Sequence, residues 1–309
     1  MRSAPGTARP GTTQALVPYA ALVGSMLSVI IGTSYAKQLF GEVGAEGTAL
    51  YRAGFSAVLL IALWRPWRRA WTRRELIDMA LYGGSLGAMN LLFYKALATI
   101  PLGVAIAIEF IGPLGLSLLH SRRIAHFAWI GLAVVGLALL LPIAAPTHGL
   151  KSMGLDPKGI VFALLAGLFW AFYIVFGQRG AHVHPGQAVA VGMAAAALVI
   201  APVGIVTAGM HLLSPRLMMQ GLIVAVVSSA FPFTLERVAL KGIPGRAFGV
   251  LVAAEPALGA LAGVVLLGET LSARQWLAIA CVIAAGAGSV LWSGDRSHGL
   301  PGDPVQDPV

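Results

Sequence analysis

Residues 94–119 read YKALATIPLGVAIAIEFIGPLGLSLL, an apolar run whose three interruptions decide how the chain is interpreted. The first interruption is a turn at Pro101, and the second is a lone acid, Glu109. The third is Pro113, which breaks a helix because proline has no backbone donor and clashes with the preceding turn. We therefore expect a broken apolar helix with one acid inside it.

The same order of features returns late in the chain. Residues 237–267 read RVALKGIPGRAFGVLVAAEPALGALAGVVLL and contain the acid Glu255, followed directly by Pro256. The prolines of the two stretches are separated by one constant offset of 143 residues, Pro101 with Pro244 and Pro113 with Pro256. A constant offset indicates an internal repeat. Apolar segments interrupted at matching places in two halves are the best sequence indication of the substrate site of a secondary transporter.

The composition requires a bilayer as solvent. Of the 309 residues, 58% are hydrophobic and only 11% are charged, whereas a soluble domain carries about 25% charged residues. The net charge of +9 belongs to loops between apolar segments, so it indicates membrane orientation rather than nucleic-acid binding. Cys281 is the single cysteine of the sequence, which excludes a disulfide framework within it.

A hydrocarbon core of about 30 Å is crossed by roughly 20 apolar residues in a helix. Ten segments have approximately this length and an apolar composition: 16–38, 46–64, 76–98, 103–119, 125–142, 159–177, 187–207, 217–235, 246–267 and 273–292. With the N-terminus in the cytoplasm, 14 Lys and Arg residues fall on the cytoplasmic side and 4 on the opposite side. This bias favours ten transmembrane helices with both termini in the cytoplasm.

Ten spans divide into two halves of five, and halves with an odd number of spans enter the membrane in opposite senses. The fold class that we predict is therefore an all-α integral membrane protein with two inverted five-helix repeats, 15–143 and 159–292. A periplasmic loop, 144–158, connects them, and the ends, 1–14 and 293–309, are interpreted as disordered cytoplasmic segments. Inverted repeats provide alternating access, because the halves can exchange conformations around a central site.

Four segments of the chain have a familiar form: GAMNLLFYKALATIPLGVAIAIEFIGPL at 87–114, HSRR at 120–123, WAFYIVFGQR at 170–179 and LGETL at 267–271. They resemble the bacterial threonine/homoserine exporters of the EamA family, within the drug/metabolite transporter superfamily. The resemblance extends from about residue 15 to residue 292. It implies the drug/metabolite transporter fold and the export of small neutral amino acids in exchange for protons. Lys95 departs from the pattern, which has an uncharged residue after Tyr94.

The two acids in apolar segments, Glu109 and Glu255, are the first candidates for the substrate site. A charged side chain at the bilayer centre costs about 2.5–3.5 kcal/mol on insertion scales, so it is retained mainly where it pairs or functions. As a functional group, such an acid binds the ammonium of the substrate or carries a coupling proton. The alternative is a structural ion pair, of Glu109 with Lys95 and of Glu255 with Arg237.

The prolines and two aromatic residues are the next candidates. Pro113 and Pro256 each free a backbone carbonyl one turn back, so we expect helix breaks at the site; a kink that serves only helix contact is the alternative. Trp170 stands in mid-span, away from the interfaces where tryptophan is usual, and Tyr173 follows one helical turn later. Both are candidates to line or gate the cavity, with an ordinary place in the bundle core as the alternative.

Four further residues complete the candidate substrate-binding set. Asn90 and Tyr94 share one face of the third span, where they can hydrogen-bond the substrate or join helices. Tyr35, in the outer part of the first span, is a candidate of the same kind. Arg52 is the expected partner of a substrate carboxylate, with snorkelling to the headgroups as the alternative.

The sequence indicates no cofactor, no metal site and no enzyme. All seven histidines fall at segment ends or in loops, without a buried ligand pair. No glycine-rich phosphate loop followed by Lys-Ser/Thr occurs, so ATP is not the expected energy source. The run GGSLG at 83–87 lies inside a spanning segment, so it indicates close helix contact rather than a nucleophile.

We therefore predict a multi-pass secondary transporter of the bacterial inner membrane, a monomer or weak homodimer, that exports threonine-like or homoserine-like amino acids by proton antiport. Its expected partners are the small-molecule substrate, protons and the lipid bilayer, and not nucleic acid. A drug, toxic-metabolite or purine exporter of the same fold is the alternative within transport. A non-transporting membrane scaffold is the alternative of another class, and the matched breaks and buried acids argue against it.

Overall fold

The computed structural model describes residues 12–119, 125–140, 156–180, 183–243 and 245–292, and within these ranges it contains helices and turns but no strand. The expected all-α fold is therefore confirmed. Most of the expected arm (1–14), connecting loop (144–158) and tail (293–309) lies outside the described residues. At the edges of these segments, α1 begins at Thr12 and α8 begins at Pro157.

The helices follow one another with short connections. In the first half they are α1 (Thr12–Gln38), α2 (Phe40–Trp64), η1 (Pro66–Arg68), α3 (Arg73–Leu97), α4 (Leu102–Glu109), α5 (Ile111–Leu119) and α6 (Ala125–Leu140). In the second half they are α8 (Pro157–Arg179), α9 (Pro185–Ala208), η2 (Gly209–Leu213), α10 (Pro215–Ala225), η3 (Val226–Ala230), α11 (Phe231–Gly242), α12 (Gly245–Val252), α13 (Glu255–Leu267) and α14 (Ala273–Trp292). Each of the ten expected spans coincides with one helix or with a broken series of helices.

Local chemistry sets several helix ends. The Thr72 side chain accepts from the Glu75 N–H while the Glu75 carboxylate accepts from the Thr72 N–H, so a capping box starts α3. Asp156 caps α8 directly before Pro157, which needs no donor at the first helical position. These residues satisfy the first backbone donors, which have no partner within the helix.

The two halves break their fourth span at the same place. Helix α4 ends at Glu109 and α12 ends at Val252, and these residues are separated by the repeat offset of 143. Pro113 and Pro256 each follow four residues later, and a proline cannot donate to the carbonyl four residues before it. Each proline therefore removes the donor that would bond the last carbonyl before the break.

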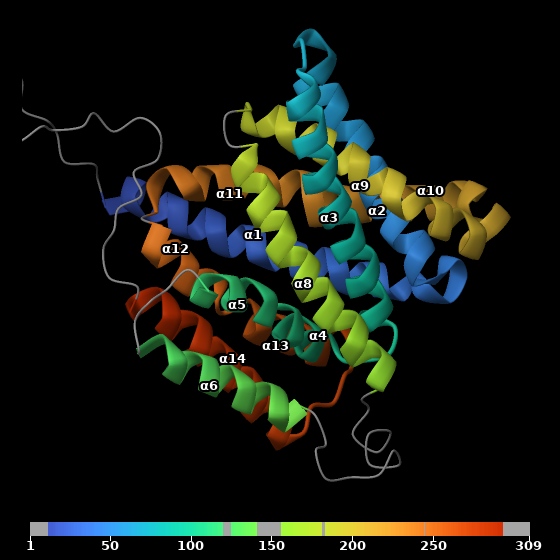
Figure 1. Cartoon of the computed structure of the whole chain (residues 1–309). Helices are drawn as coiled ribbons and strands as arrows, with labels where there is room; N and C mark the ends of the chain where they lie inside the picture. Colours follow the sequence, from blue (N-terminus) through green and yellow to red (C-terminus); the bar gives the residue numbers. More distant parts are fainter. Residues whose placement is uncertain (1–11, 120–124, 141–155, 181–182, 244, 293–309) are drawn as a thin grey trace, which may run out of the picture.

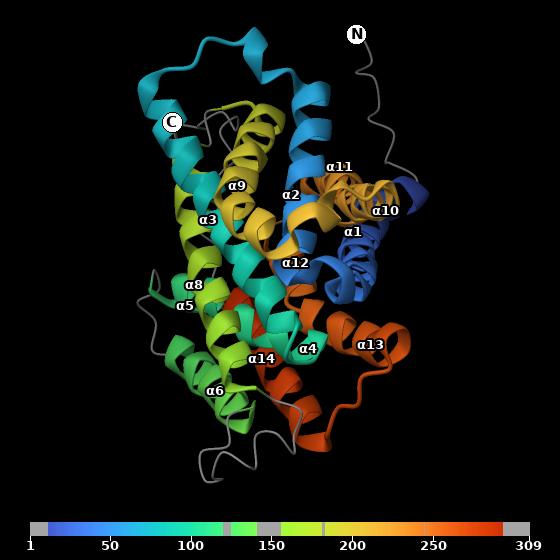
Figure 2. The same cartoon turned by 90° about the vertical axis from the view of Figure 1, so that its right-hand side faces the viewer.

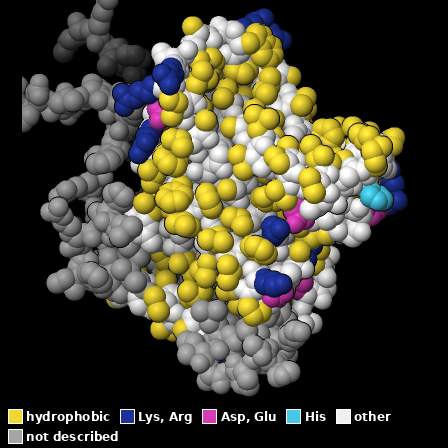
Figure 3. Space-filling model, turned by 45° about the vertical axis from the view of Figure 1, so that its right-hand side comes forward, with side chains coloured by type: hydrophobic (Ala, Val, Ile, Leu, Met, Phe, Trp, Pro, Cys, Tyr) yellow, Lys and Arg dark blue, Asp and Glu magenta, His cyan; other side chains and the backbone are white. Residues whose placement is uncertain are grey.

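Hydrophobic side chains cover much of the face that Figure 3 shows, as a bilayer requires. Seven helices are long and apolar enough to cross a membrane, and shorter apolar helices cover Leu102–Leu116 and Ala273–Gly288. Large side chains point outward on several of them, for example Val206 on α9 with 83% and Val265 on α13 with 76% exposure. The protein is therefore a multi-pass membrane protein, and these outward apolar side chains are suited to lipid tails.

The two halves interlock rather than standing apart (Figures 1 and 2). Helix α3 of the first half packs on α8 of the second, and α11 of the second packs on α1 of the first. Helices at equivalent positions also meet, α2 with α9 and α6 with α14. A two-fold relation between the halves produces this pattern of contacts, because each contact between the halves then recurs with the roles of the halves reversed. The sense in which each half crosses the membrane stays a prediction.

Glycine allows α8 to approach the break between α4 and α5. A Cβ atom at Gly112 would overlap the carbonyl oxygen of Gly167, and a Cβ atom at Gly167 would overlap the carbonyl oxygen of Glu109. The freed Glu109 carbonyl is therefore covered by α8. Small residues that bring backbones together are the usual means of helix association in membranes.

We predict that Gly112→Ala destabilises the protein by about 1–3 kcal/mol, the usual cost of adding a methyl group to a filled contact. Gly115→Ala is the matched control on the same helix, because a Cβ at Gly115 meets nothing within 4 Å. Alanine is favoured over glycine inside a helix by about 0.5–1 kcal/mol, so the control will be neutral or stabilising. Thermal unfolding in detergent measures both, and equal Tm values for the two variants would contradict the contact.

Candidate functional site

A cavity of about 160 Å³ lies where the helix breaks meet α1, α2, α3 and α8. Both acids of the apolar segments, Glu109 and Glu255, are in its wall. The residues that line it are Val29, Ile30, Thr33, Arg52, Met89, Asn90, Phe93, Ile106, Glu109, Trp170 and Glu255. The lining comes from both halves, so the cavity lies at the interface of the repeats, where transporters of this architecture place their substrate site.

The structure brings together five of the eight residues that we predict to bind substrate: Glu109, Glu255, Asn90, Trp170 and Arg52. They come from segments spread over most of the chain. Three carry ionisable groups, which are expensive in a bilayer and are usually found at substrate or ion pathways. The arrangement therefore supports a binding site, although binding itself stays a prediction.

The two acids experience opposite helix dipoles. Glu109 is the last residue of α4, at the negative end of the helix, and only 6% of it is exposed. Glu255 is the first residue of α13, at the positive end, where a carboxylate is stabilised. A charge on Glu109 thus depends more on a cationic neighbour than a charge on Glu255 does.

Arg52 is held at the cavity by hydrogen bonds to an irregular helical turn. As at the breaks near Pro113 and Pro256, a proline follows this turn. Its Nη2 donates to the Ser228 carbonyl at 3.2 Å and its Nε donates to the Ser229 hydroxyl at 3.4 Å. Both serines belong to η3, a single π-helical turn inside the eighth span. Pro232 lies four residues after Ser228 and cannot donate to that carbonyl. The carbonyl is therefore available to the guanidinium.

Asn90 and Trp170 form the remaining polar and aromatic wall. The Asn90 Nδ2 donates to the Leu86 carbonyl within α3 at 2.8 Å, which fixes the amide plane. Trp170 meets Phe110, the residue at the first helix break, edge to face with ring centroids 6.0 Å apart. This contact couples the wall of the cavity to the break.

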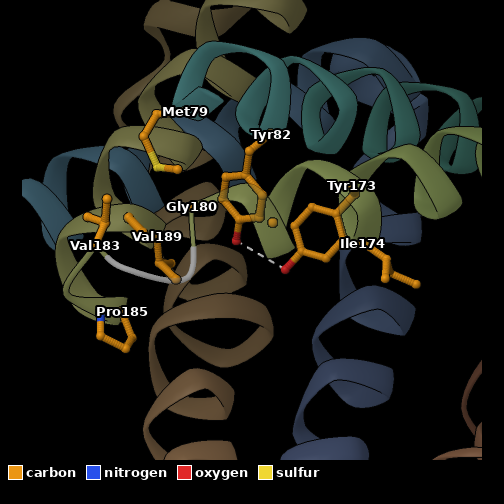
Figure 4. Close-up of a pocket in the computed structure, with 10 residues that line it drawn as sticks. Met79, Tyr82, Tyr173, Ile174, Gly180, Val183, Pro185 and Val189 are labelled. Atoms are coloured by element: carbon orange, nitrogen blue, oxygen red, sulfur yellow. Dashed lines mark hydrogen bonds between the residues drawn. The ribbon is translucent and has the colours of Figure 1, made fainter. Parts of the chain in front are cut away.

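Three of the predicted binding residues are placed elsewhere. Tyr94 is fully buried behind the cavity, and the Cζ atom of Arg52 lies 5.7 Å from the centre of its ring. The Tyr94 hydroxyl has no hydrogen-bond partner among the described residues. Tyr35 packs into the apolar core. Tyr173 lines a second cavity of about 320 Å³, where its hydroxyl lies 3.1 Å from that of Tyr82 (Figure 4). The two prolines define the breaks without lining the cavity.

The alternative reading of Glu109, an ion pair with Lys95, is wrong. The Lys95 ammonium lies 2.8 Å from the Glu46 carboxylate, so it joins α3 to α2 within the first half. This partner could not be predicted from the sequence, because Glu46 is 49 residues from Lys95. The two side chains meet only because α2 and α3 pack together. The alternative pairing of Glu255 with Arg237 involves a side chain outside the described residues. Glu109 is therefore free of the base expected to neutralise it.

Sequence reasoning missed six lining residues: Val29, Ile30, Thr33, Met89, Phe93 and Ile106. On α1 the three are spaced i, i+1 and i+4, and on α3 the missed residues flank Asn90 on one face. A helix that is apolar on every side has no stripe to mark its cavity face. The one available signal was Thr33, a polar residue in an apolar run.

The described residues contain no group of three His, Cys, Asp or Glu side chains placed to hold a metal ion. The chemistry that the cavity offers is therefore ionic and hydrogen-bonding: a guanidinium, two carboxyl groups, an amide and a hydroxyl.

Comparison with known proteins agrees with this architecture. The EamA-like transporter family model matches residues 157–291. The threonine/homoserine exporter RhtA of Salmonella typhimurium is 44% identical over 285 residues, which cover 91% of this chain and 95% of the relative. The threonine/homoserine exporter RhtA of Escherichia coli K12 is 43% identical over 275 residues, 89% and 92% of the two chains. A solved crystal structure, 22% identical, covers 91% of this chain and 97% of its own with a TM-score of 0.55, so it shares the fold.

We predict that Lys95 and Glu46 stabilise one another and that Lys95 and Glu109 do not. A double-mutant cycle with Lys95→Met and Glu46→Gln, measured by unfolding in detergent, will give a coupling energy of about 0.5–2 kcal/mol, as expected for residues in contact. The cycle of Lys95→Met with Glu109→Gln is the control and will be additive. Coupling in the second cycle but not in the first would restore the original pairing.

Proposed function

This chain belongs to the EamA-like transporter family, and from that premise we propose that it exports small neutral amino acids such as threonine and homoserine across the bacterial inner membrane. The 43–44% identity to threonine/homoserine exporters over about nine-tenths of the chain supports this substrate class. The observation that carries the proposal is the cavity in which Arg52 faces the same space as Glu109 and Glu255.

A zwitterionic amino acid matches the charges of this cavity. Its carboxylate needs a cation, and the Arg52 guanidinium offers a fixed fork of donors. Its ammonium needs an acid, which Glu109 or Glu255 supplies. A side-chain hydroxyl, which threonine and homoserine share, has Thr33 and Asn90 in the same wall as hydrogen-bond partners. The polar groups of the substrate therefore replace the hydrogen bonds to water that these side chains lose in the bilayer.

The size of the cavity favours a small substrate. Sites for drug-sized ligands enclose about 300–1,000 Å³, whereas this one encloses about 160 Å³. A drug exporter of the same fold would need a larger site at the breaks, whereas a purine base is close to threonine in size. The volume therefore ranks amino-acid export above drug export.

We also propose that export is coupled to proton entry. Glu109 stands at the negative end of α4, and burial disfavours the charged form of an acid. When a substrate ammonium is bound, the charge on Glu109 is neutralised; when the substrate leaves, a proton replaces it. The charge of Glu109 is therefore neutralised in every step, either by the substrate ammonium or by a proton. The two halves change conformation only while this charge is neutralised.

We predict that Glu109→Gln and Glu255→Gln lower the efflux of radiolabelled threonine from loaded vesicles. A charged group in a hydrogen bond contributes about 1.5–3 kcal/mol, so loss of the acid that binds ammonium will reduce efflux about tenfold or more. Glu42→Gln is the control, because Glu42 lies outside the cavity with its side chain 47% exposed. Unchanged efflux in both cavity variants would remove the acids from the mechanism.

Proton coupling has its own test in vesicles with and without an imposed pH gradient. A gradient with the more acidic solution outside will accelerate threonine efflux by the unmodified protein, because protons move inward as substrate leaves. Glu109→Gln will abolish this acceleration, since a glutamine cannot carry the proton. Efflux by the unmodified protein that ignores the gradient would refute antiport. Transport of purines or drug-like cations in place of threonine would instead favour the alternative substrate class.

A further inference from the structure

The LGETL segment places an acid at a fixed point after the ninth span. Helix α13 ends at Leu267, and Gly268 adopts a left-handed conformation with φ of 66°. The Glu269 N–H then donates to the Gly263 carbonyl at 3.0 Å. A glycine in this conformation followed by a bond back to the last turn is a common helix terminus. The Glu269 side chain is thereby directed against the neighbouring helices.

One carboxylate joins three helices there. Glu269 Oε1 lies 2.6 Å from the Lys37 ammonium at the end of α1, and Oε2 accepts the Leu102 N–H at the start of α4 at 2.9 Å. The pair is shielded from solvent, with 23% of the Lys37 side chain and 12% of the Glu269 side chain exposed. A carboxylate at a helix N-terminus is also favoured by the helix dipole. We refer to Lys37, Leu102 and Glu269 as the Glu269 latch.

The latch connects the two halves through helices that form the cavity. Helix α1 contributes Thr33, one turn before Lys37, and α4 contributes Ile106 and Glu109. Glu269 follows α13, which begins with Glu255. A movement of α1 and α4 away from α13 at this end would break both bonds of the latch.

The sequence does not repeat the two charged residues of the latch at the equivalent position of the other half in each case. At the repeat offset of 143, Lys37 corresponds to Gly180 and Glu269 to His126, so neither the cation nor the acid is repeated. Gly180 instead lines the larger cavity, of about 320 Å³, next to the Tyr82–Tyr173 pair (Figure 4). The Lys37–Glu269 pair is therefore not part of the internal repeat.

Helix α8 shows that these features occupy opposite ends. Gly159, near its start, contacts Thr99, three residues before Leu102. Gly167, in its middle, contacts the carbonyl of Glu109, and Gly180 follows its last residue. From Gly159 to Gly180 the helix rises about 30 Å, which is the thickness of a bilayer core.

We propose that Glu269 is a positioning residue for transport: it holds α1 and α4 so that the cavity is closed at the Lys37 end, and substrate passes there only after the latch breaks. This inference rests on the proposed transport function and on the expected orientation, in which the Lys37 end is periplasmic. It assigns to the LGETL segment a role in access to the site rather than in binding.

The test measures access to the cavity from each side of the membrane. A full-length Cys281→Ser protein carries Thr33→Cys as the probe, and a membrane-impermeant maleimide is added to spheroplasts or to inverted vesicles. Glu269→Gln will raise the periplasmic labelling rate about tenfold, because removal of a state-specific contact shifts the population towards the open state. The cytoplasmic labelling rate will not rise. Labelling needs no substrate, so its outcome is independent of whether threonine is exported.

Two further variants separate the latch from general loosening. Glu46→Gln is the matched control, because its pair with Lys95 is also partly shielded at this end but lies within the first half; it will leave both labelling rates unchanged. Lys37→Met will reproduce the effect of Glu269→Gln, and the double variant will not exceed the larger single effect. Unchanged periplasmic labelling in Glu269→Gln, or an equal rise on both sides, would overturn the proposal.

Discussion

A bilayer offers no water to a carboxyl group or to a broken backbone, and this constraint explains where the functional groups of the protein lie. Three irregular places in the backbone near the cavity have a carbonyl that a proline four residues later cannot bond, at Glu109, Val252 and Ser228. Such groups are tolerated in a membrane only where protein buries them or a cavity hydrates them. The acids and Arg52 therefore collect at the same breaks, where ionic and backbone groups satisfy one another.

The interlocked halves maintain this arrangement. Helix α8 covers the Glu109 carbonyl through Gly167, while α1 and α11 place η3 beside Arg52. The cavity is bounded by both repeats, so a movement of one half against the other changes access to it. Ion pairs then divide into two kinds: Lys95–Glu46 strengthens one half, and Lys37–Glu269 joins the halves. Only the second kind can depend on the state of the transporter.

The spans and the breaks could be predicted because they depend on residues close together in the sequence. Proline acts on the carbonyl one turn away, and an apolar run of sufficient length spans whatever its partners are. The partner of Lys95 could not be predicted, because it depends on how α2 and α3 pack. For the same reason Tyr35 and Tyr94 were expected at the cavity but face the core. Ser228 was overlooked although Pro232 marks its free carbonyl by the same rule that identified the other breaks.

The most direct test of the central claim is a structure of the protein with threonine bound, determined by electron cryo-microscopy. The account predicts threonine in the cavity of about 160 Å³, with its ammonium nitrogen at hydrogen-bond distance from the carboxylate of Glu109 or Glu255 and its carboxylate facing Arg52. Threonine bound in the larger cavity beside Tyr82 and Tyr173, with no ligand density between the two acids, would contradict it.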